Sequence, residues 1–396
     1  MVDDSVIERG KLFDLLLADM RHRNLIGVGI EPIDYNGIYY TLRENYALNL
    51  DKESIGDEAK YTIVATGIKE ELLKRKDIRV PFADVISESF CKSCKPARAI
   101  YAPSVIKIDP YTFVHMPNLE EVDLPELRTI GDSCFISLPK LRTLNLPKVD
   151  FIGRYSFYSL SSIEDISLPS VRHISSNVFR ELNSLIRLRL ELLDYAKGED
   201  ILDCPKLKTI IANNLRKIGD GSFCNLESLM ECNIVNVESI GSNCFVNASP
   251  KKMHLYELAK IGEESFNSSI NLEVFSAPKL KSVSNRCFNN LIDLEILNLT
   301  GVRHLGAGCI TQCPKLRSLN LKSCVSIESG SIVDLPILKK LDFPKLISLG
   351  SNSVYLLRSL EEAIMPRLSE IPANTFFCCE RLCKVVLKSS KKVQNG

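Results

Sequence analysis

The sequence has no apolar run that approaches the roughly 18 residues a membrane-spanning helix needs. Its most apolar stretch near the N-terminus, residues 12–17, is interrupted by Asp14 and lacks the basic start and unbroken apolar core of a signal peptide. The formal net charge is only +1, which excludes a generally basic surface of the kind that attracts nucleic acid or anionic lipid. We therefore expect a cytoplasmic protein with no membrane span and no nucleic-acid partner.

Motifs for catalysis and cofactor binding are also missing. Gly27-Val28-Gly29 lacks the third glycine of a dinucleotide fingerprint, and there is no phosphate-binding loop. Cys91 and Cys94 form the only CxxC, without the two further ligands that zinc requires. The histidines form no catalytic pattern with a nearby Ser or Cys; they are His22, His115, His173, His254 and His304. We predict that the protein is not an enzyme and has neither cofactor nor metal.

What the sequence does contain is a repeat. The stretch from Leu124 to Pro147 reads L-P-x-x-x-x-I-G-x-x-x-F-x-x-L-x-x-L-x-x-L-x-L-P, and this template recurs down the chain. The second apolar residue of each predicted strand is Val80, Ala102, Leu124, Leu146, Leu168, Leu190, Ala212, Ile234, Leu255, Ala277, Leu299, Leu321, Phe343, Met365 or Leu387. Successive positions are 22 residues apart in thirteen steps and 21 in one, from Ile234 to Leu255. The periodicity predicts one array of about 14 to 15 repeats over residues 78–390.

Each column of the template has a structural interpretation. Alternation such as Leu144-Asn145-Leu146 predicts one short half-buried strand per repeat, and these strands should stack into a parallel sheet. The Ile-Gly pair predicts a turn at the glycine. An aromatic column should form an internal ladder on the side opposite the strands; it comprises Phe90, Phe113, Phe135, Phe157, Phe179, Phe223, Phe245, Phe266, Phe288 and Phe376, with Ile201, Ile310, Ile332 and Val354 as replacements.

The cysteines follow the same columns. Fourteen cysteines in a chain without an export signal are expected to be thiols in a reducing cytosol. Four of them directly precede the aromatic column, where other repeats have Ser or Thr; they are Cys134, Cys244, Cys287 and Cys309. We interpret this position as a site for a small buried side chain.

The unit Ile-Gly-x-x-x-Phe-x-x-[Leu/Cys]-x-x-Leu-x-x-Leu-x-Leu-Pro resembles the BspA-like leucine-rich repeat family over about four fifths of the chain. Cys204, Cys313 and Cys379 occupy the Cys position of that pattern, three residues after the aromatic column. The resemblance implies a leucine-rich repeat solenoid with short parallel β-strands on one face. It also implies the roles in attachment that many surface or secreted members of the family have.

Residues 1–77 do not follow the template and are acidic, with 11 Lys and Arg against 15 Asp and Glu. Helices are predicted from Ser5 to about Arg23 and over residues 66–76, and strands over residues 25–29, 37–50 and 61–65. We interpret this as a small α+β segment that caps the array or has an accessory recognition role. A short basic tail, residues 391–396, follows the repeats.

The remaining candidate for function is the outward face of the predicted strands. We predict a protein-binding patch there, because Arg, Tyr and exposed apolar groups are enriched at interfaces. Its residues are Arg187, Arg189, Ile211, Lys252, His254 and Tyr256. An ordinary solvated sheet is the alternative. Residues 191–201 form the most irregular repeat, with Ala196-Lys197 in place of Ile-Gly, which is typical of a bend or a contact site.

The function predicted from these features is a non-enzymatic scaffold for protein-protein interaction that uses the exposed β-face of the solenoid. Neither the protein partner nor the oligomeric state is specified by the sequence. Two alternatives remain: a surface adhesin or extracellular binding protein exported without a recognisable signal, and an enzyme activity in residues 1–77.

Overall fold

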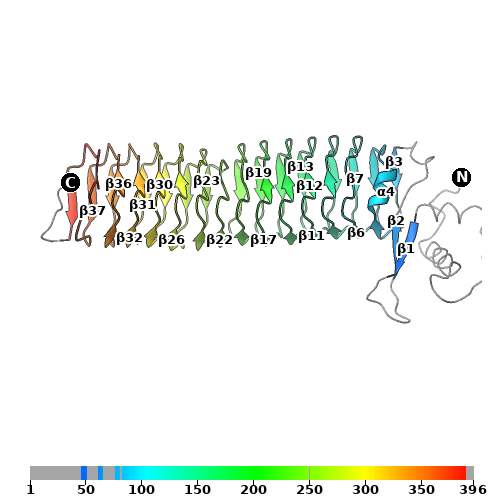
Figure 1. Ribbon diagram of the computed structural model, residues 1–396, viewed down its shortest axis with the longest axis horizontal. Coiled ribbons are helices and arrows are strands. Elements are labelled where there is room, and N and C mark those ends of the chain that lie inside the picture. Colours follow the sequence, from blue (N-terminus) through cyan, green and yellow to red (C-terminus); the bar gives the residue numbers. More distant parts are fainter. Residues whose placement is uncertain (1–45, 51–60, 66–75, 81–82, 249, 389–396) are drawn as a thin grey trace, which may run out of the picture. The chain divides into compact units, whose positions relative to one another are not determined.

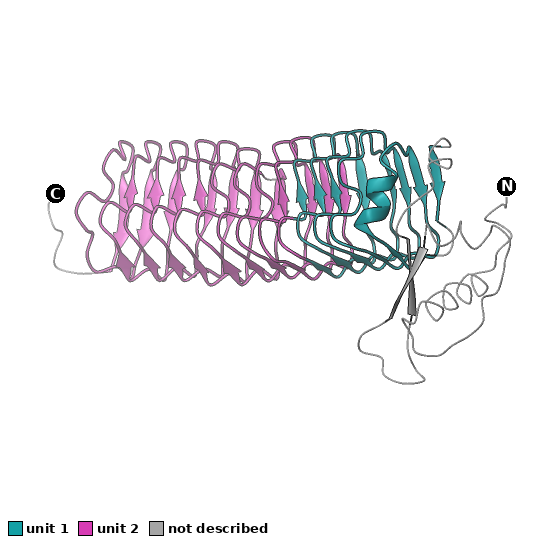
Figure 2. Ribbon diagram, turned by 45° about the vertical axis from the view of Figure 1, so that its right-hand side comes forward, with its two compact units in different colours: residues 1–174, 178–185 teal, residues 175–177, 186–396 magenta. Residues whose placement is uncertain are grey.

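The computed structural model describes residues 46–50, 61–65, 76–80, 83–248 and 250–388, with backbone only for the first two ranges. The chain divides into two compact units (Figure 2). Unit 1 comprises residues 1–174 and 178–185, and unit 2 comprises residues 175–177 and 186–396. Each unit is a stack of turns whose strands pair in parallel with the same strands of the next turn (Figure 1). The predicted leucine-rich repeat solenoid is confirmed.

In unit 1 most turns have two or three short strands. The strands of the first face are β3 (Asp77–Arg79), β5 (Ala99–Tyr101), β7 (Glu121–Asp123), β10 (Thr143–Asn145) and β13 (Asp165–Ser167). The second face has β4 (Val85–Ile86), β6 (Lys107–Ile108), β8 (Thr129–Ile130), β11 (Phe151–Ile152) and β14 (His173–Ile174). The third has β9 (Phe135–Ile136), β12 (Phe157–Tyr158) and β15 (Phe179–Arg180), and the short helix α4 (Glu88–Ser93) occupies this place in an earlier turn.

Unit 2 repeats this arrangement. Its first face has β16 (Arg187–Arg189), β19 (Thr209–Ile211), β21 (Glu231–Asn233), β23 (Lys252–His254), β25 (Val274–Ser276), β28 (Ile296–Asn298), β31 (Ser318–Asn320), β34 (Lys340–Asp342), β37 (Glu362–Met365) and β38 (Lys384–Leu387). The second has β17 (Tyr195–Ala196), β20 (Lys217–Ile218), β22 (Ser239–Ile240), β24 (Lys260–Ile261), β26 (Ser282–Val283), β29 (His304–Leu305), β32 (Ser326–Ile327) and β35 (Ser348–Leu349). The third has β18 (Ile201–Leu202), β27 (Phe288–Asn289), β30 (Ile310–Thr311), β33 (Ile332–Val333) and β36 (Val354–Tyr355).

The prediction of a single strand per repeat is therefore wrong for most turns. Every straight segment of a turn lies above the same segment of its neighbour, at about the 4.8 Å spacing of hydrogen-bonded strands. All three segments can then form a ladder, even where only two residues are extended, as in the pairing of Phe157 with Phe135 and Phe179. The sequence reveals only the first-face strand because that one alone shows apolar and polar residues in alternation.

The aromatic column forms the predicted internal ladder. In unit 1 the rings of Phe113, Phe135, Phe157 and Phe179 stack with centroids 5.1, 5.2 and 5.3 Å apart. In unit 2 the rings of Phe223, Phe245, Phe266 and Phe288 stack at 5.2, 5.0 and 5.8 Å. These eight side chains are fully buried. The ladder and the leucine columns together form the core of each unit.

The position before the aromatic column holds a small side chain that also forms hydrogen bonds. The hydroxyl of Ser156 donates to the carbonyl oxygens of Gly153 and Gly131, both 2.8 Å away. In unit 2 the hydroxyl of Ser265 donates in the same way to Gly262 at 2.8 Å and Gly241 at 2.7 Å. Each such side chain links its own turn to the preceding one. The cysteines of this column donate similarly but more weakly, since a thiol is a weak donor.

The glycines of the Ile-Gly pairs have a different role from the predicted one. The pattern predicts a turn at five of them, and none has a positive φ: Gly131, Gly153, Gly219, Gly241 and Gly262. A Cβ atom on Gly241 would instead lie 2.7 Å from the backbone nitrogen of Asp220 and 2.9 Å from the carbonyl carbon of Gly219. Glycine is required because successive turns approach closely at this corner, not because the backbone is left-handed.

The N-terminal segment contributes two described strands. β1 (Tyr46–Leu50) pairs antiparallel with β2 (Tyr61–Ala65), as expected for two of the predicted strand regions. β2 then pairs in parallel with β4, with Val64 opposite Val85 and Ala65 opposite Ile86. The predicted helix of residues 5–23, the strand of residues 25–29 and the helix of residues 66–76 lie outside the described residues, except Lys76, which is in a bend.

Candidate functional site

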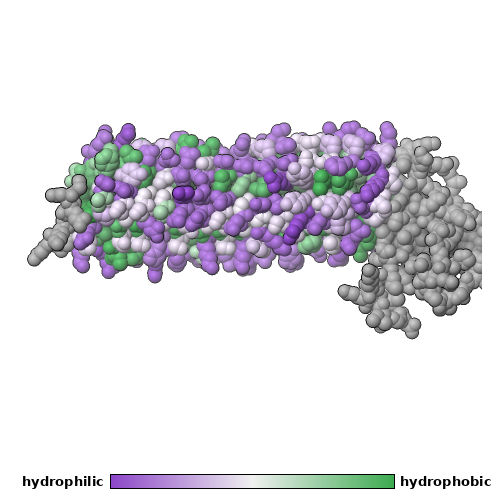
Figure 3. Space-filling view, in the orientation of Figure 1, coloured by the Kyte–Doolittle hydropathy of each residue, from purple (hydrophilic) through white to green (hydrophobic). Residues whose placement is uncertain are grey.

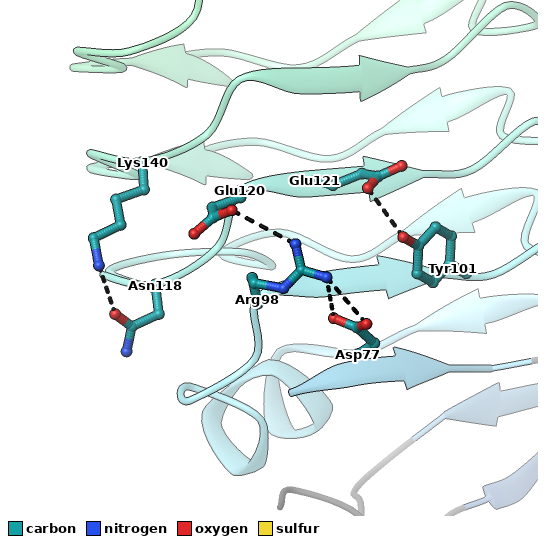
Figure 4. Close-up of polar contacts among 7 residues, drawn as sticks. All are labelled: Asp77, Arg98, Tyr101, Asn118, Glu120, Glu121 and Lys140. Atoms are coloured by element: carbon teal, nitrogen blue, oxygen red, sulfur yellow. Dashed lines mark hydrogen bonds and ion pairs between the residues drawn. The ribbon is translucent and has the colours of Figure 1, made fainter. Parts of the chain in front are cut away.

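Several positive charges on the first face are neutralised by carboxylates of a neighbouring turn. In unit 1 the Arg98 guanidinium lies 2.9 Å from Asp77 and 3.6 Å from Glu120, on the turns before and after it (Figure 4). The hydroxyl of Tyr101 donates to Glu121 at 3.0 Å in the same region (Figure 4). These contacts use side chains that face one another along the stack, whereas Arg142, just before β10, is exposed and has no carboxylate partner among the described residues.

The same pairing continues through the later turns of unit 2. Cations of the first-face strands, or of the residue just before them, pair with carboxylates one turn away. The pairs are Lys251 with Glu273 at 3.0 Å, Arg317 with Glu295 at 2.8 Å, Lys339 with Glu361 at 3.4 Å and Lys340 with Glu362 at 2.7 Å. Each exposed pair contributes little to stability. The two charges of each pair cancel, however, so a paired position attracts a charged ligand only weakly.

Three cations of unit 2 differ. Arg189 ends β16, Lys208 directly precedes β19 and Lys252 begins β23, and all three are exposed. Within the part of the chain that the structure describes, no carboxylate lies within 4.0 Å of their charged nitrogens, and none takes part in a salt bridge. These unpaired positive charges lie within the region predicted as a protein-binding patch.

The structure brings the six predicted residues together in two groups. On the first ladder Arg187 is in register with Thr209, and Arg189 is in register with Ile211. On β23 Lys252 and His254 point outward, and the His254 ring stacks on Tyr256 with centroids 6.1 Å apart. The two groups belong to different hydrogen-bonded sheets, one of β16, β19 and β21 and one that starts at β23. The interruption coincides with the single 21-residue step of the repeat.

Two further apolar residues at this interruption escaped the sequence prediction. Met230 is 56 % exposed just before β21, and Val235 is 50 % exposed just after it, one turn before Tyr256, which is 56 % exposed. Val235 and Tyr256 occupy the column that holds Pro278, Pro344 and Pro366 in later turns. Two consecutive repeats thus have a large apolar residue where other repeats have proline. This substitution pattern is the sequence signal that could have identified Val235.

We call this region the β16–β23 patch. Its members are Arg187, Arg189, Lys208, Ile211, Met230, Val235, Lys252, His254 and Tyr256. It combines three unpaired cations, Arg189, Lys208 and Lys252, with exposed apolar side chains on and beside short strands. Figure 3 shows hydrophobic residues scattered among hydrophilic ones on the visible side of the described residues.

The irregular repeat of residues 191–201 contains a buried carboxyl group. Asp200 occupies the column that Ser or Cys fills in most other turns and is completely buried. Its Oδ2 accepts a hydrogen bond from the Gly198 amide at 2.9 Å, whereas its Oδ1 has no partner. Burial raises the pKa of Asp200 to about 7, against the opposing effects of the Gly198 amide and the Lys197 charge.

The cysteines have the character of core residues. All fourteen are free, and burial raises the pKa of Cys134 and of Cys244 to about 12, so both thiols remain protonated at neutral pH. Cys91 and Cys94 of the CxxC are buried in and just after α4. The described residues contain no group of three or more His, Cys, Asp or Glu side chains able to hold a metal ion.

Among the described residues, no helix is long enough and apolar enough to cross a lipid bilayer.

Comparison with known proteins identifies the repeat. A family profile described as "BspA type Leucine rich repeat region" matches residues 84–194, 201–317 and 303–395, with six copies. A leucine-rich repeat protein from Bacteroides ovatus is similar in structure, with a TM-score of 0.55 and 20 % identity over 86 % of this chain and 96 % of that one. A leucine rich cell surface protein from Faecalibacterium prausnitzii aligns over 92 % of this chain and 97 % of its own, with 16 % identity and a TM-score of 0.35. No curated protein matches the chain.

Proposed function

Because the chain belongs to the BspA-type leucine-rich repeat family, we propose that it is a non-enzymatic scaffold that binds another protein through the β16–β23 patch. The observation that carries this proposal is the set of unpaired cations, Arg189, Lys208 and Lys252, beside exposed apolar side chains. Elsewhere on the first face of unit 2, cations such as Arg317 and Lys340 are paired within the stack. A surface that departs from this pattern in one place is the best candidate for a binding site.

The composition of the patch supports protein recognition. Arginine and tyrosine are enriched at protein interfaces, and energetically important residues tend to be aromatic or arginine side chains surrounded by neutral contacts. Tyr256 is held by its stacking on His254, which reduces the entropy that it loses on binding. The outward side chains also project from hydrogen-bonded strands, so little backbone ordering is needed.

The test is quantitative affinity capture with the full chain and two double variants of equal charge change. Arg187→Glu with Arg189→Glu alters the patch, whereas Lys322→Glu with Lys345→Glu alters exposed cations that follow β31 and β34. We expect the first variant to lose the captured partner and the second to retain it. Retention of the same partners by both variants would rule out the patch as the binding site.

We further propose that the protein acts in the cytosol. All fourteen cysteines are unpaired thiols, many of them in the core, and such a cysteine content suits a reducing compartment. The alternative is a surface adhesin, a role that the family resemblance suggests. Protease treatment of intact cells separates the two: the cytosolic protein is fully protected, and its digestion would establish exposure at the surface.

Finally, we propose that residues 1–77 cap the N-terminal end of the array. The pairing of β2 with β4 supports this role, because it covers the edge of the second-face sheet that β4 would otherwise expose. Solenoids need such cover, since an open sheet edge is a template for pairing with other chains. Replacement of Val64 in β2 by proline tests the cap, because it should break the pairing of β2 with β4.

A further inference from the structure

The charges of the β16–β23 patch fall into two groups. Arg189 and Lys208 lie on or beside β16 and β19, and Lys252 lies on β23. Between them, on β21, is Glu231, the only carboxylate in these four strands. An anionic ligand is therefore attracted at both ends of the patch and repelled at its middle. This distribution favours two separate negative charges over one continuous anionic strand.

The centre of the patch is suited to an apolar group. Ile211 is half-buried on β19, and Val235 follows β21 with half of its surface exposed. Met230 lies at the other end of β21. A ligand side chain resting between the two positive groups would contact mainly the aliphatic surface of Ile211, Val235 and Met230, with Thr209, Glu231 and Asn233 as the polar groups beside it. An apolar side chain meets these conditions, and a phosphate does not.

The spacing of the two positive groups specifies the form of the ligand. Paired strands are about 4.8 Å apart, and the step from the turn of β21 to the turn of β23 keeps such a pair on the second face, between β22 and β24. The strands β16 and β23, three turns apart, are therefore separated by roughly 14 Å. An extended polypeptide advances about 3.3 Å per residue, so roughly four residues cover this distance. Side chains i, i+2 and i+4 of an extended chain point to the same side. Two acidic residues four apart, with an apolar residue midway, would all face the patch.

We infer that the β16–β23 patch recognises an extended segment of another protein with the pattern acidic-x-apolar-x-acidic, one carboxylate lying on Arg189 and Lys208 and the other on Lys252, beside His254. This inference rests on the proposed function and specifies the chemistry of its partner. The apolar residue lies over Ile211 and Val235. Repulsion by Glu231 disfavours a nucleic-acid backbone, whose charges are evenly spaced.

The test uses fluorescein-labelled synthetic peptides and the full chain, with binding followed by fluorescence anisotropy. The probe contains Glu-Ser-Leu-Ser-Glu, and the comparison peptides contain Gln-Ser-Leu-Ser-Gln, Glu-Ser-Ser-Ser-Glu, or two glutamates placed two or six residues apart. We expect the probe to bind about tenfold more tightly than the glutamine peptide, since two partly exposed ion pairs are lost. Both the serine peptide and the respaced peptides should also bind more weakly.

Matched variants assign the effect to the patch. Arg189→Gln and Lys252→Gln should each weaken binding of the probe by about twofold to fivefold, the range of a single exposed ion pair. Arg317→Gln and Lys340→Gln remove cations that are already paired on the same face, so they should leave binding unchanged. Circular dichroism melting of all four variants confirms that each is folded.

Several results would overturn the inference. Equal binding of the glutamate and glutamine peptides would exclude recognition of carboxylates. Tighter binding of a twelve-nucleotide oligothymidylate than of the probe would show that the patch selects phosphates. Self-association of the chain that Lys252→Gln abolishes would identify a second copy as the partner. If affinity capture still depends on Arg187 and Arg189 in any of these cases, the proposed function stands and only the acidic motif fails.

Discussion

The Oδ2 atom of Asp200 accepts a hydrogen bond from the backbone amide of Gly198, 2.9 Å away. The second oxygen of the same carboxylate is buried without a partner. In most other turns this column holds a donor, as when the Ser265 hydroxyl donates to the carbonyl oxygens of Gly262 and Gly241. An ionised carboxylate can only accept hydrogen bonds. Charged Asp200 therefore cannot donate to backbone carbonyl oxygens as the serine hydroxyls of this column do.

The first prediction is that Asp200 makes stability fall as the pH rises. Its folded pKa is about 7, raised above the roughly 3.9 of an unfolded aspartate, so the contribution of neutral Asp200 is fully present below about pH 4 and is lost as pH rises towards 7. Asp200→Ser should remove this dependence and stabilise the protein at pH 8 by up to about 4 kcal/mol. Urea unfolding at pH 5 and pH 8 measures it.

The control for this prediction is Glu227→Gln, which removes an exposed carboxylate of the same unit. It should leave the difference in unfolding free energy between pH 5 and pH 8 close to that of the unmodified chain. Asp200→Ser would contradict the prediction if it left that difference unchanged, because the buried carboxyl group would then not be its source.

The second prediction concerns close contact between turns. A Cβ atom on Gly241 would lie 2.7 Å from the backbone nitrogen of Asp220, and backbone cannot move aside as a side chain can. Gly241→Ala should therefore lower the free energy of unfolding by about 1–3 kcal/mol, the usual cost of overpacking. Gly330→Asn is the control, since Gly330 has φ of 67° with open space around it and asparagine tolerates that conformation. Equal melting temperatures for the two variants would refute the steric argument.

The third prediction ranks positions of the aromatic ladder. Phe245 stacks on both Phe223 and Phe266 and is completely buried, so Phe245→Ala should cost about 3–5 kcal/mol. Phe376 belongs to the same column but is only partly buried in the last described turn. Phe376→Ala should therefore cost less than half as much, because less apolar surface returns to water. Chemical denaturation of both variants tests the order, and a larger loss for Phe376→Ala would reverse it.

The sequence was sufficient to predict the repeat, its register and the buried ladder, because stacking requires the same residue type at the same position in every turn. Phe135, Phe157 and Phe179 could be aligned from their spacing alone. The two-residue strands of the second and third faces could not, because two residues show no periodicity and their pairing depends on the turns beside them. The role of Gly241 was also hidden, since only the backbone of the neighbouring turn excludes a Cβ atom.

The candidate site was predictable to a lesser degree. The outward positions of Arg189 and Lys252 follow from strand alternation, and the structure places both on the first face. Their lack of partners does not follow from the sequence, because it depends on which side chains face each other across turns. Lys340, in the same column as Lys252, is paired with Glu362. The sequence indicates the break between β21 and β23 only through the 21-residue step. Which residues are exposed at the break could not be predicted from the sequence.

The last prediction tests the N-terminal cap. Val64 of β2 lies opposite Val85 of β4 in a parallel ladder, and a proline there removes the backbone N–H of residue 64 and constrains φ. Val64→Pro should therefore detach β2 and accelerate amide hydrogen exchange at Val85 and Ile86, while exchange in β28 stays unchanged because its pairing with β25 and β31 is not affected. Val64→Thr, which keeps the amide and the β-branched shape, should leave exchange at both places as it was. Uniformly faster exchange throughout unit 2 in the proline variant would show instead that residues 1–77 stabilise the whole chain rather than one edge, and unchanged exchange at Val85 would remove the basis for a cap.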